Sequence, residues 1–194
     1  GYVDLQDPLW LGYEYEQLYA AVIESDWPTG HPARCLFIGG GAFAFQRRLL
    51  AQHEEGIECV TCEIDPQVTE AGYRHLALQE DPRHQIVHDD ARTFVEGLDP
   101  AEARFDFVFG DAFNDLAVPF HLTTREFAEV IESRMTPDGI YLMNVIDAYE
   151  SGLFLGAMLS TLQSVFDHVR MLSISPRHDA YRDTYVLVAS NRRL

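Results

Sequence analysis

A glycine-rich segment with the letters LFIGGGAFA occupies residues 36–44. Gly39, Gly41 and Ala44 fit the pattern G-x-G-x-x-G/A between a strand and a helix, where glycines let a ligand approach the backbone closely. An ordinary strand-to-helix turn would use the same residue types. The segment therefore predicts a nucleotide-binding loop, with Gly39, Gly40 and Gly41 as cofactor contacts, and leaves a plain turn as the alternative.

An acidic residue follows the next β-rich run at a suitable offset. Glu63 stands 24 positions after Gly39 (63 − 39), and an acidic side chain about 20 residues beyond such a loop binds the ribose hydroxyls of a nucleotide. Asp65 is the alternative for this role. Its place directly before Pro66 favours a helix N-cap instead.

Two neighbouring aspartates, Asp89 and Asp90, close the third β-rich run. In open α/β sheets ligands bind beyond the carboxyl ends of strands, so we expect Asp89, Asp90 and Ala91 to face the ligand. Asp90 is the predicted acceptor for the exocyclic amine of adenine, and capping of the helix that starts at Ala91 is the alternative. A metal site of His88 with both aspartates is not expected, because no further ligands occur at useful spacing.

Asp111 follows the nearly all-apolar run at residues 105–109. Such a run predicts a buried central strand, which would hold Asp111 rigidly at the edge of the sheet. A carboxylate there could stabilise a bound cation or take a proton from an attacking nucleophile. A turn-capping role is the alternative.

Two other reactive residue types are given structural interpretations. Cys59 and Cys62 form a C-x-x-C within a predicted strand, where positions three apart point to opposite faces, so we expect buried thiols rather than a redox or zinc site. His121 is expected at the surface.

The elements that position these residues alternate between β-rich runs and helical periodicity, which predicts an α/β domain with a largely parallel sheet. A helix over about residues 11–25 should pack on the core, and Thr123 with Glu126 predicts the capping box of a later helix. Residues 137–139 predict a turn. The last two runs, 169–173 and 184–189, are joined by too short a connection for a parallel crossover and should pair antiparallel.

This arrangement resembles the class I S-adenosylmethionine (SAM) methyltransferase-like, Rossmann-like fold, and we expect one domain over residues 1–194. The expected strands lie at residues 34–38, 58–63, 85–88, 105–109 and 140–145, besides the last pair.

The chain has 194 residues, with 14 Lys+Arg and 31 Asp+Glu, hence a net charge of −17. This acidity argues against nucleic acid as a partner, which requires a basic face. No run approaches the ~20 apolar residues of a membrane-spanning helix. Three cysteines are too few for a disulfide framework, so a cytoplasmic location is expected.

Several segments together resemble the spermidine synthase-like (polyamine aminopropyltransferase-like) family, in particular a bacterial branch often fused to a membrane transporter domain. The segments are DLQDP at 4–8, YEYE at 13–16, the loop at 39–44, CEIDP at 62–66, DDAR at 89–92, DAF at 111–113 and HLTTREF at 121–127.

The resemblance implies a transferase that uses SAM or decarboxylated SAM as co-substrate, without a metal, and moves an aminopropyl group to a small-molecule amine. By the same resemblance Glu63 would hold the ribose, Asp90 the adenine, and Asp111 would be the base. Tyr15 would line the acceptor pocket, and a homodimer is expected.

The sequence also departs from the family pattern. Ala42 stands where spermidine synthases have an aspartate that grips the amine of the decarboxylated nucleoside. Asn114 replaces their second acceptor-binding aspartate, although Asp115 is adjacent, and we expect Asn114 and Asp115 to contact the substrate. The gate segment before the last strand is replaced by SPRH at 175–178, and the N-terminal β-hairpin domain is missing from these residues.

These departures leave other functions open. Methyl transfer is the first alternative, because Ala42 leaves room for the amino-acid tail of intact SAM. A non-catalytic nucleoside-binding module is the second. A nicotinamide-dependent oxidoreductase is disfavoured by the antiparallel ending.

Overall fold

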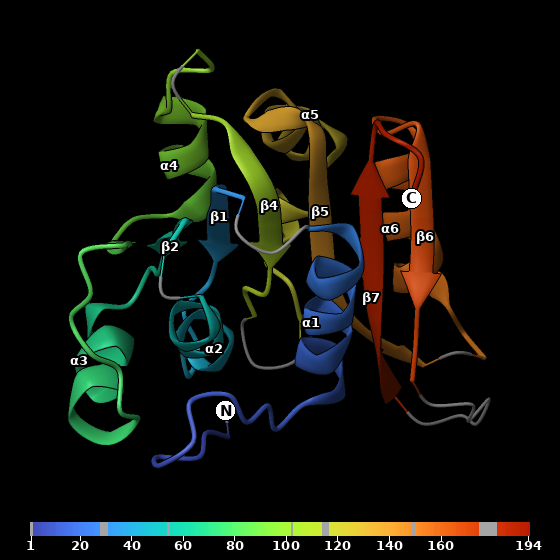
Figure 1. Cartoon of the computed structure of the whole chain (residues 1–194). Coiled ribbons are helices and arrows are strands. Elements are labelled where there is room, and N and C mark those ends of the chain that lie inside the picture. The colour runs from blue at the N-terminus through green and yellow to red at the C-terminus, as the bar shows by residue number, and fades with distance from the viewer. Residues whose placement is uncertain are drawn as a thin grey trace.

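Seven strands form one sheet in the order β3-β2-β1-β4-β5-β7-β6 (Figure 1). The structure is a computed structural model that describes residues 2–27, 31–53, 55–101, 103–113, 117–148, 150–174 and 182–194. The strands are β1 (Ala33–Ile38), β2 (Ile57–Cys62), β3 (His84–Val87), β4 (Phe105–Gly110), β5 (Met135–Ala148), β6 (His168–Leu172) and β7 (Arg182–Ser190). The helices are α1 (Glu14–Asp26), α2 (Ala44–Gln52), α3 (Pro66–His75), α4 (Ala91–Gly97), α5 (Arg125–Ser133), α6 (Leu153–Gln163) and the 3-10 helix η1 (Phe120–Leu122).

The sheet is parallel except at β7. Strands β3, β2, β1, β4 and β5 pair in parallel, whereas β7 pairs antiparallel with both β5 and β6. In Figure 1 the arrow of β7 points against those of β4 and β6. The prediction of an α/β sheet with an antiparallel last strand is therefore confirmed.

Helices cover both faces of the sheet, and each face has its own apolar core. Residues of α1 and α2 pack on one face with Cys59, Phe37 and Phe109. Residues of α4, α5 and α6 pack on the other face with Cys62 and Val108. Cys59 and Cys62 thus lie on opposite faces, both buried and free, as the period of a strand predicts.

The N-terminal helix begins three residues later than expected, at Glu14. Its buried positions include Glu16, Tyr19, Ala20 and Ile23, which recur at i, i+3, i+4 and i+7 and so lie on one face. Leu18, also in this helix, is only half-buried. The buried face therefore includes an acidic residue.

Local sequence signals locate most helix starts well. Asp65 caps α3 by accepting from Gln67 N at 2.8 Å, with Pro66 at the first helical position. The prediction that Thr123 caps α5 is wrong by one residue. Thr124 is the N-cap and accepts from Phe127 N at 3.2 Å, while Thr123 donates its hydroxyl proton to Phe120 O.

The turn predicted at residues 137–139 lies instead inside β5. Between paired positions, β4 advances from Phe105 to Phe107 while β5 advances from Met135 to Ile140. The additional residues of β5 form a bulge-like irregularity rather than a separate turn, because β5 pairs with β4 both before them, at Met135, and after them, at Ile140.

Some predicted features fall outside the described ranges, namely Asn114, Asp115 and the segment 175–178. Among the residues that the structure describes, no helix is long and apolar enough to cross a membrane.

Candidate active site

The candidate residues named from the sequence converge at one edge of the sheet. Gly39 directly follows β1, Glu63 follows β2, and Asp111 follows β4, while Asp89 and Asp90 lie just beyond β3. This is the edge toward which the arrowheads of β1 and β4 point in Figure 1. All of these residues line a single cavity of about 550 Å³, which lies within the range of roughly 300–1,000 Å³ typical of small-molecule sites.

The glycine loop has a backbone that most residues could not adopt. Gly39 and Gly41 have φ of +99° and +52°, conformations that glycine adopts without strain. A Cβ on Gly39 would lie 2.7 Å from the Asp111 carbonyl oxygen, whereas one on Gly41 would meet no atom within 4 Å. Gly39 thus allows the close approach of the Asp111 backbone, and Gly41 leaves open space at the cavity.

Glu63 is held in place by the loop itself. Its Oε2 accepts from Gly40 N at 2.8 Å and its Oε1 accepts from Asp65 N at 2.9 Å, and the residue is 8% exposed. Each carboxylate oxygen keeps a further lone pair for a hydroxyl donor. The side chain of Asp65 is used as the α3 cap, so Glu63 is the acidic side chain of this pair that lines the cavity.

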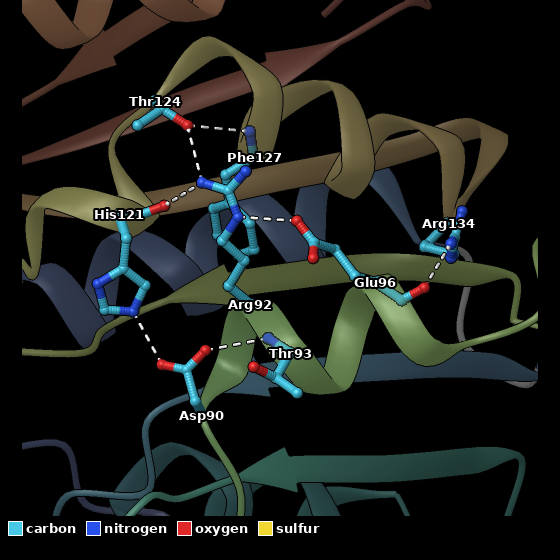
Figure 2. A network of polar contacts seen from close by, with 8 residues as sticks. All are labelled: Asp90, Arg92, Thr93, Glu96, His121, Thr124, Phe127 and Arg134. Carbon is cyan, nitrogen blue, oxygen red and sulfur yellow. Dashed lines mark hydrogen bonds and ion pairs between the residues drawn. The ribbon is translucent and has the colours of Figure 1, made fainter.

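Asp90 is fixed from two sides, as Figure 2 shows. Its Oδ1 accepts from Thr93 N at 3.0 Å and so caps α4, and its Oδ2 lies 2.8 Å from His121 Nε2. Burial works against the charge, but the hydrogen bonds from Thr93 and His121 prevail and lower the pKa of Asp90. Its carboxylate both caps the helix and lines the cavity.

His121 was expected at the surface, and its side chain is half-buried. His121 lines the cavity and pairs with Asp90. Arg92 positions the segment from His121 to Thr124, since its Nη1 donates to His121 O at 3.1 Å and to Thr124 Oγ1 at 3.3 Å (Figure 2). Its Nε donates to Glu96 Oε1 at 2.7 Å. The His88 ring bonds to Thr69 Oγ1 at 3.0 Å.

Asp111 is held by side chains of two other elements. The Tyr15 hydroxyl donates to its Oδ2 and Asn144 Nδ2 donates to its Oδ1, both at 2.8 Å. Burial raises the pKa of Asp111 to about 6, against the two hydrogen bonds, which lower it. The carboxylate bonds to side chains of α1 and β5 rather than to its own loop, so the turn-capping alternative finds no support in these contacts.

The cavity also contains residues that the sequence pattern did not single out, among them Glu16 on α1 and Asn144 on β5. Both are buried, at 5% and 3% exposure, and both line the cavity. Burial raises the pKa of Glu16 to about 7, and the charge of Asp111 raises it further, against a hydrogen bond from Tyr13 N. The available signal was a polar residue within an apolar pattern, since Glu16 begins the buried face of α1 and Asn144 interrupts a buried strand.

Comparison with known proteins assigns this architecture to a class. The fold is similar to that of human methyltransferase-like protein 13 in complex with SAH, with a TM-score of 0.70, 19% identity and coverage of 83% of this chain and 72% of that chain. It is also similar to a probable spermidine synthase from Corynebacterium glutamicum, with a TM-score of 0.85, 24% identity and coverage of 96% of this chain and 67% of that chain. The chain therefore has the SAM-methyltransferase-like α/β fold.

The family follows from the sequence match. Residues 15–189 match the spermine/spermidine synthase domain, and the chain belongs to that family. A polyamine aminopropyltransferase from Aeropyrum pernix is 27% identical over 152 residues, which cover 75% of this chain and 48% of that protein. The chain thus spans about half of the length of that relative.

Proposed function

We propose that the chain is the nucleoside-binding and catalytic unit of an aminopropyltransferase, which moves an aminopropyl group from decarboxylated SAM to an amine. Asp111 carries this proposal, because it is a partly buried carboxylate held by Tyr15 and Asn144 beside the Gly39 backbone. The name of the Aeropyrum pernix relative supports the same reaction.

The other cavity residues fit a nucleoside co-substrate in this proposal. Glu63 accepts the ribose hydroxyls, and Asp90 and Ala91 lie at the adenine with Asp89 beside them. The loop of Gly39, Gly40 and Gly41 gives room for close approach. The fit rests on fixed acceptors, since Glu63 and Asp90 are already oriented by backbone N–H groups.

The proposed reaction is a displacement at carbon. The nitrogen of the amine attacks the propyl carbon bonded to the positively charged sulfur. The C–N bond forms as the C–S bond breaks. The electron pair of the C–S bond remains on sulfur, so the leaving group is neutral methylthioadenosine. Asp111 accepts the proton that the nitrogen loses. Its raised pKa of about 6 makes it a stronger base than an exposed aspartate, and because this value is still below 7 the carboxylate remains mostly ionised at neutral pH.

Substitution of Asp111 tests the proposal. We expect Asp111→Asn to lower turnover about 10²–10⁴-fold, the usual contribution of a positioned general base, with methylthioadenosine affinity retained by calorimetry. Asp106→Asn, in the preceding strand, is the matched control. Undiminished turnover would remove Asp111 as the base, and absence of methylthioadenosine binding to the wild type would remove the proposed co-substrate.

Methyl transfer is the second candidate, favoured by one observation. Ala42 lines the cavity at the position where the family pattern has an aspartate for the amine of decarboxylated SAM. Calorimetric titration with both nucleosides separates the two reactions, since tighter binding of intact SAM than of decarboxylated SAM would favour a methyltransferase.

A further inference from the structure

His121 reaches the cavity from the 3-10 helix η1 and pairs with Asp90, the N-cap of α4. Its Nε2 lies 2.8 Å from Asp90 Oδ2, and the two side chains are 33% and 32% exposed. Both residues line the cavity, and Figure 2 shows the ring and the carboxylate pointing toward each other. In the proposed function Asp90 lies at the adenine, so the group that meets the base is a pair of side chains.

The pair divides the two oxygens of the Asp90 carboxylate. Oδ1 accepts from Thr93 N at 3.0 Å, and Oδ2 bonds to the His121 ring. The terminal torsion of an aspartate side chain is soft, so a contact at one oxygen alone would leave the carboxylate plane free to turn. The second contact fixes this plane. Because each carboxylate oxygen accepts more than one hydrogen bond, Oδ2 keeps a lone pair for a donor from a ligand.

The direction of this bond follows from the chemistry of the pair. Burial works to raise the pKa of Asp90, but hydrogen bonds from Thr93 and His121 outweigh it and lower the pKa. An ionised carboxylate only accepts hydrogen bonds, so His121 Nε2 is the nitrogen that carries the proton. A neutral imidazole already meets this requirement. The ring therefore orients Asp90 without a positive charge.

Asp89, the neighbouring aspartate, is turned toward its own backbone. Its Oδ1 accepts from Asp90 N at 2.8 Å, and its carbonyl oxygen accepts from the Cys62 thiol at 3.3 Å. Within the described part of the chain, no side chain of another element bonds to the Asp89 carboxylate. Asp90 is therefore the aspartate of the two whose orientation depends on a distant residue.

The main chain of His121 is anchored without its ring. Arg92 Nη1 donates to His121 O at 3.1 Å (Figure 2), and the next residue, Leu122, is 6% exposed in the apolar core. Thr124 fixes the start of α5 through its hydroxyl. Substitution of the ring alone should therefore leave the segment in place, so that a change in ligand binding reports the contact with Asp90.

We propose that His121 is a positioning residue for base recognition, which holds Asp90 in the orientation that accepts the 6-amino group of adenine and so makes the site prefer 6-amino to 6-oxo purine nucleosides. This rests on the proposed function, in which Asp90 lies at the adenine. A 6-amino group donates to the carboxylate, whereas a 6-oxo group is an acceptor and is repelled by it. Both effects require the carboxylate to face the base, and thus both require His121.

His121→Leu tests the proposal, because leucine keeps an apolar side chain of similar reach but donates no hydrogen bond. The probes are methylthioadenosine and methylthioinosine, which differ at position 6 of the purine, each titrated by calorimetry. His88→Leu is the matched control, since the His88 ring bonds to Thr69 and neither residue lines the cavity. His121→Gln is the conservative variant, because the glutamine amide supplies an N–H donor at a similar distance from the backbone.

We expect His121→Leu to weaken methylthioadenosine binding about 5–50-fold, part of what a hydrogen bond to a charged group contributes. Methylthioinosine binding should change little, so the preference for the 6-amino base falls by nearly the same factor. His121→Gln should restore most of this preference, and His88→Leu should match the wild type. In turnover, KM for decarboxylated SAM should rise while kcat changes little, because Asp90 does not face the reacting atoms.

A double-mutant cycle separates positioning of Asp90 from direct contact of His121 with the base. Asp90→Ser keeps an N-cap hydroxyl for Thr93 N but removes the acceptor for the ring. In this background His121→Leu should have no further effect on methylthioadenosine affinity, since residues that act as one unit are not additive. An undiminished effect would overturn the proposal, because His121 would then bind the base itself.

Equal losses for the two nucleosides in His121→Leu, or no loss for either, would also overturn the role of His121. Equal affinities of the wild type for both nucleosides would overturn it and leave the proposed reaction standing, whereas absence of binding of either would overturn both. If the wild type prefers methylthioadenosine through His121 but forms no aminopropyl product, the proposed function fails while the role of His121 stands.

Discussion

Tyr15, Asp111 and Asn144 form a hydrogen-bonded chain that joins α1, the end of β4 and β5. Both donors are neutral groups, since burial and the neighbouring Asp111 charge raise the pKa of Tyr15 far above its usual value. The carboxylate is thereby oriented without an ion pair to any residue that the structure describes. Its charge remains available to a substrate cation.

The second buried carboxylate, Glu16, should make folding stability depend on pH. Its pKa rises from 4.5 to about 7 on folding, so the folded state binds this proton more tightly than the unfolded chain. The favourable contribution is present below pH 4.5 and is lost as the pH rises through 7. At pH 8 the ionised group costs about 3 kcal/mol, since the pKa shift of about 2.5 units corresponds to 1.36 kcal/mol per unit.

Glu16→Gln should therefore stabilise the protein more at pH 8 than at pH 5. Urea denaturation at both pH values gives the two free energies of unfolding, with Glu14→Gln as the control. A stability difference between variant and wild type that is the same at both pH values would show that Glu16 is not raised in pKa.

At the scale of elements, the segment from η1 to α5 forms one wall of the cavity, and its attachment to α4 is polar. Arg92 donates to both His121 O and Thr124 Oγ1 (Figure 2). Thr124 also caps α5. The Thr124 hydroxyl therefore connects the start of α5 to Arg92 of α4, two positions after Asp90.

Thr124→Ala should cost about 1 kcal/mol of unfolding free energy, typical of a lost N-cap, whereas Thr123→Ala should cost only a few tenths. Urea denaturation of the two variants distinguishes them, because the residues are adjacent and identical in type. A larger loss at Thr123 would contradict the observed cap position.

Most elements of this fold could be predicted because their signals are local. Asp65 with Pro66 locates α3, the apolar run before Asp111 locates β4, and the short final connection predicts the antiparallel pair. The cap of α5 was predicted one residue early, since adjacent threonines give the same local signal. Tertiary packing of Phe127 and Leu122 decides between the two.

The residues predicted from the strand ends of the parallel sheet line the cavity, whereas the sequence pattern did not single out Glu16 and Asn144, and the roles of all these residues stay predictions. Glu63, Asp90 and Asp111 lie at the ends of consecutive parallel strands, so topology alone brings them together. Glu16 and Asn144 come from α1 and from the middle of β5. Only the packing of these elements decides which polar side chain turns toward the cavity.

At the scale of the whole molecule, the net charge of −17 should attract cationic acceptors. Electrostatic steering weakens as salt screens the field. We expect KM for 1,4-diaminobutane to rise about three- to tenfold between low salt and about 0.3 M NaCl. The affinity for uncharged methylthioadenosine, measured by calorimetry over the same range, should change little, and an equal loss for both ligands would exclude steering.

The position of β7 has a consequence for how the chain is made. Arg182–Ser190 lies between β5 and β6, two strands that are synthesised before it. Until the ribosome has released these nine residues, both neighbours present open edges that invite pairing with other chains. A nascent chain that stalls before residue 182 is therefore an aggregation hazard, although most of its sheet has already been translated.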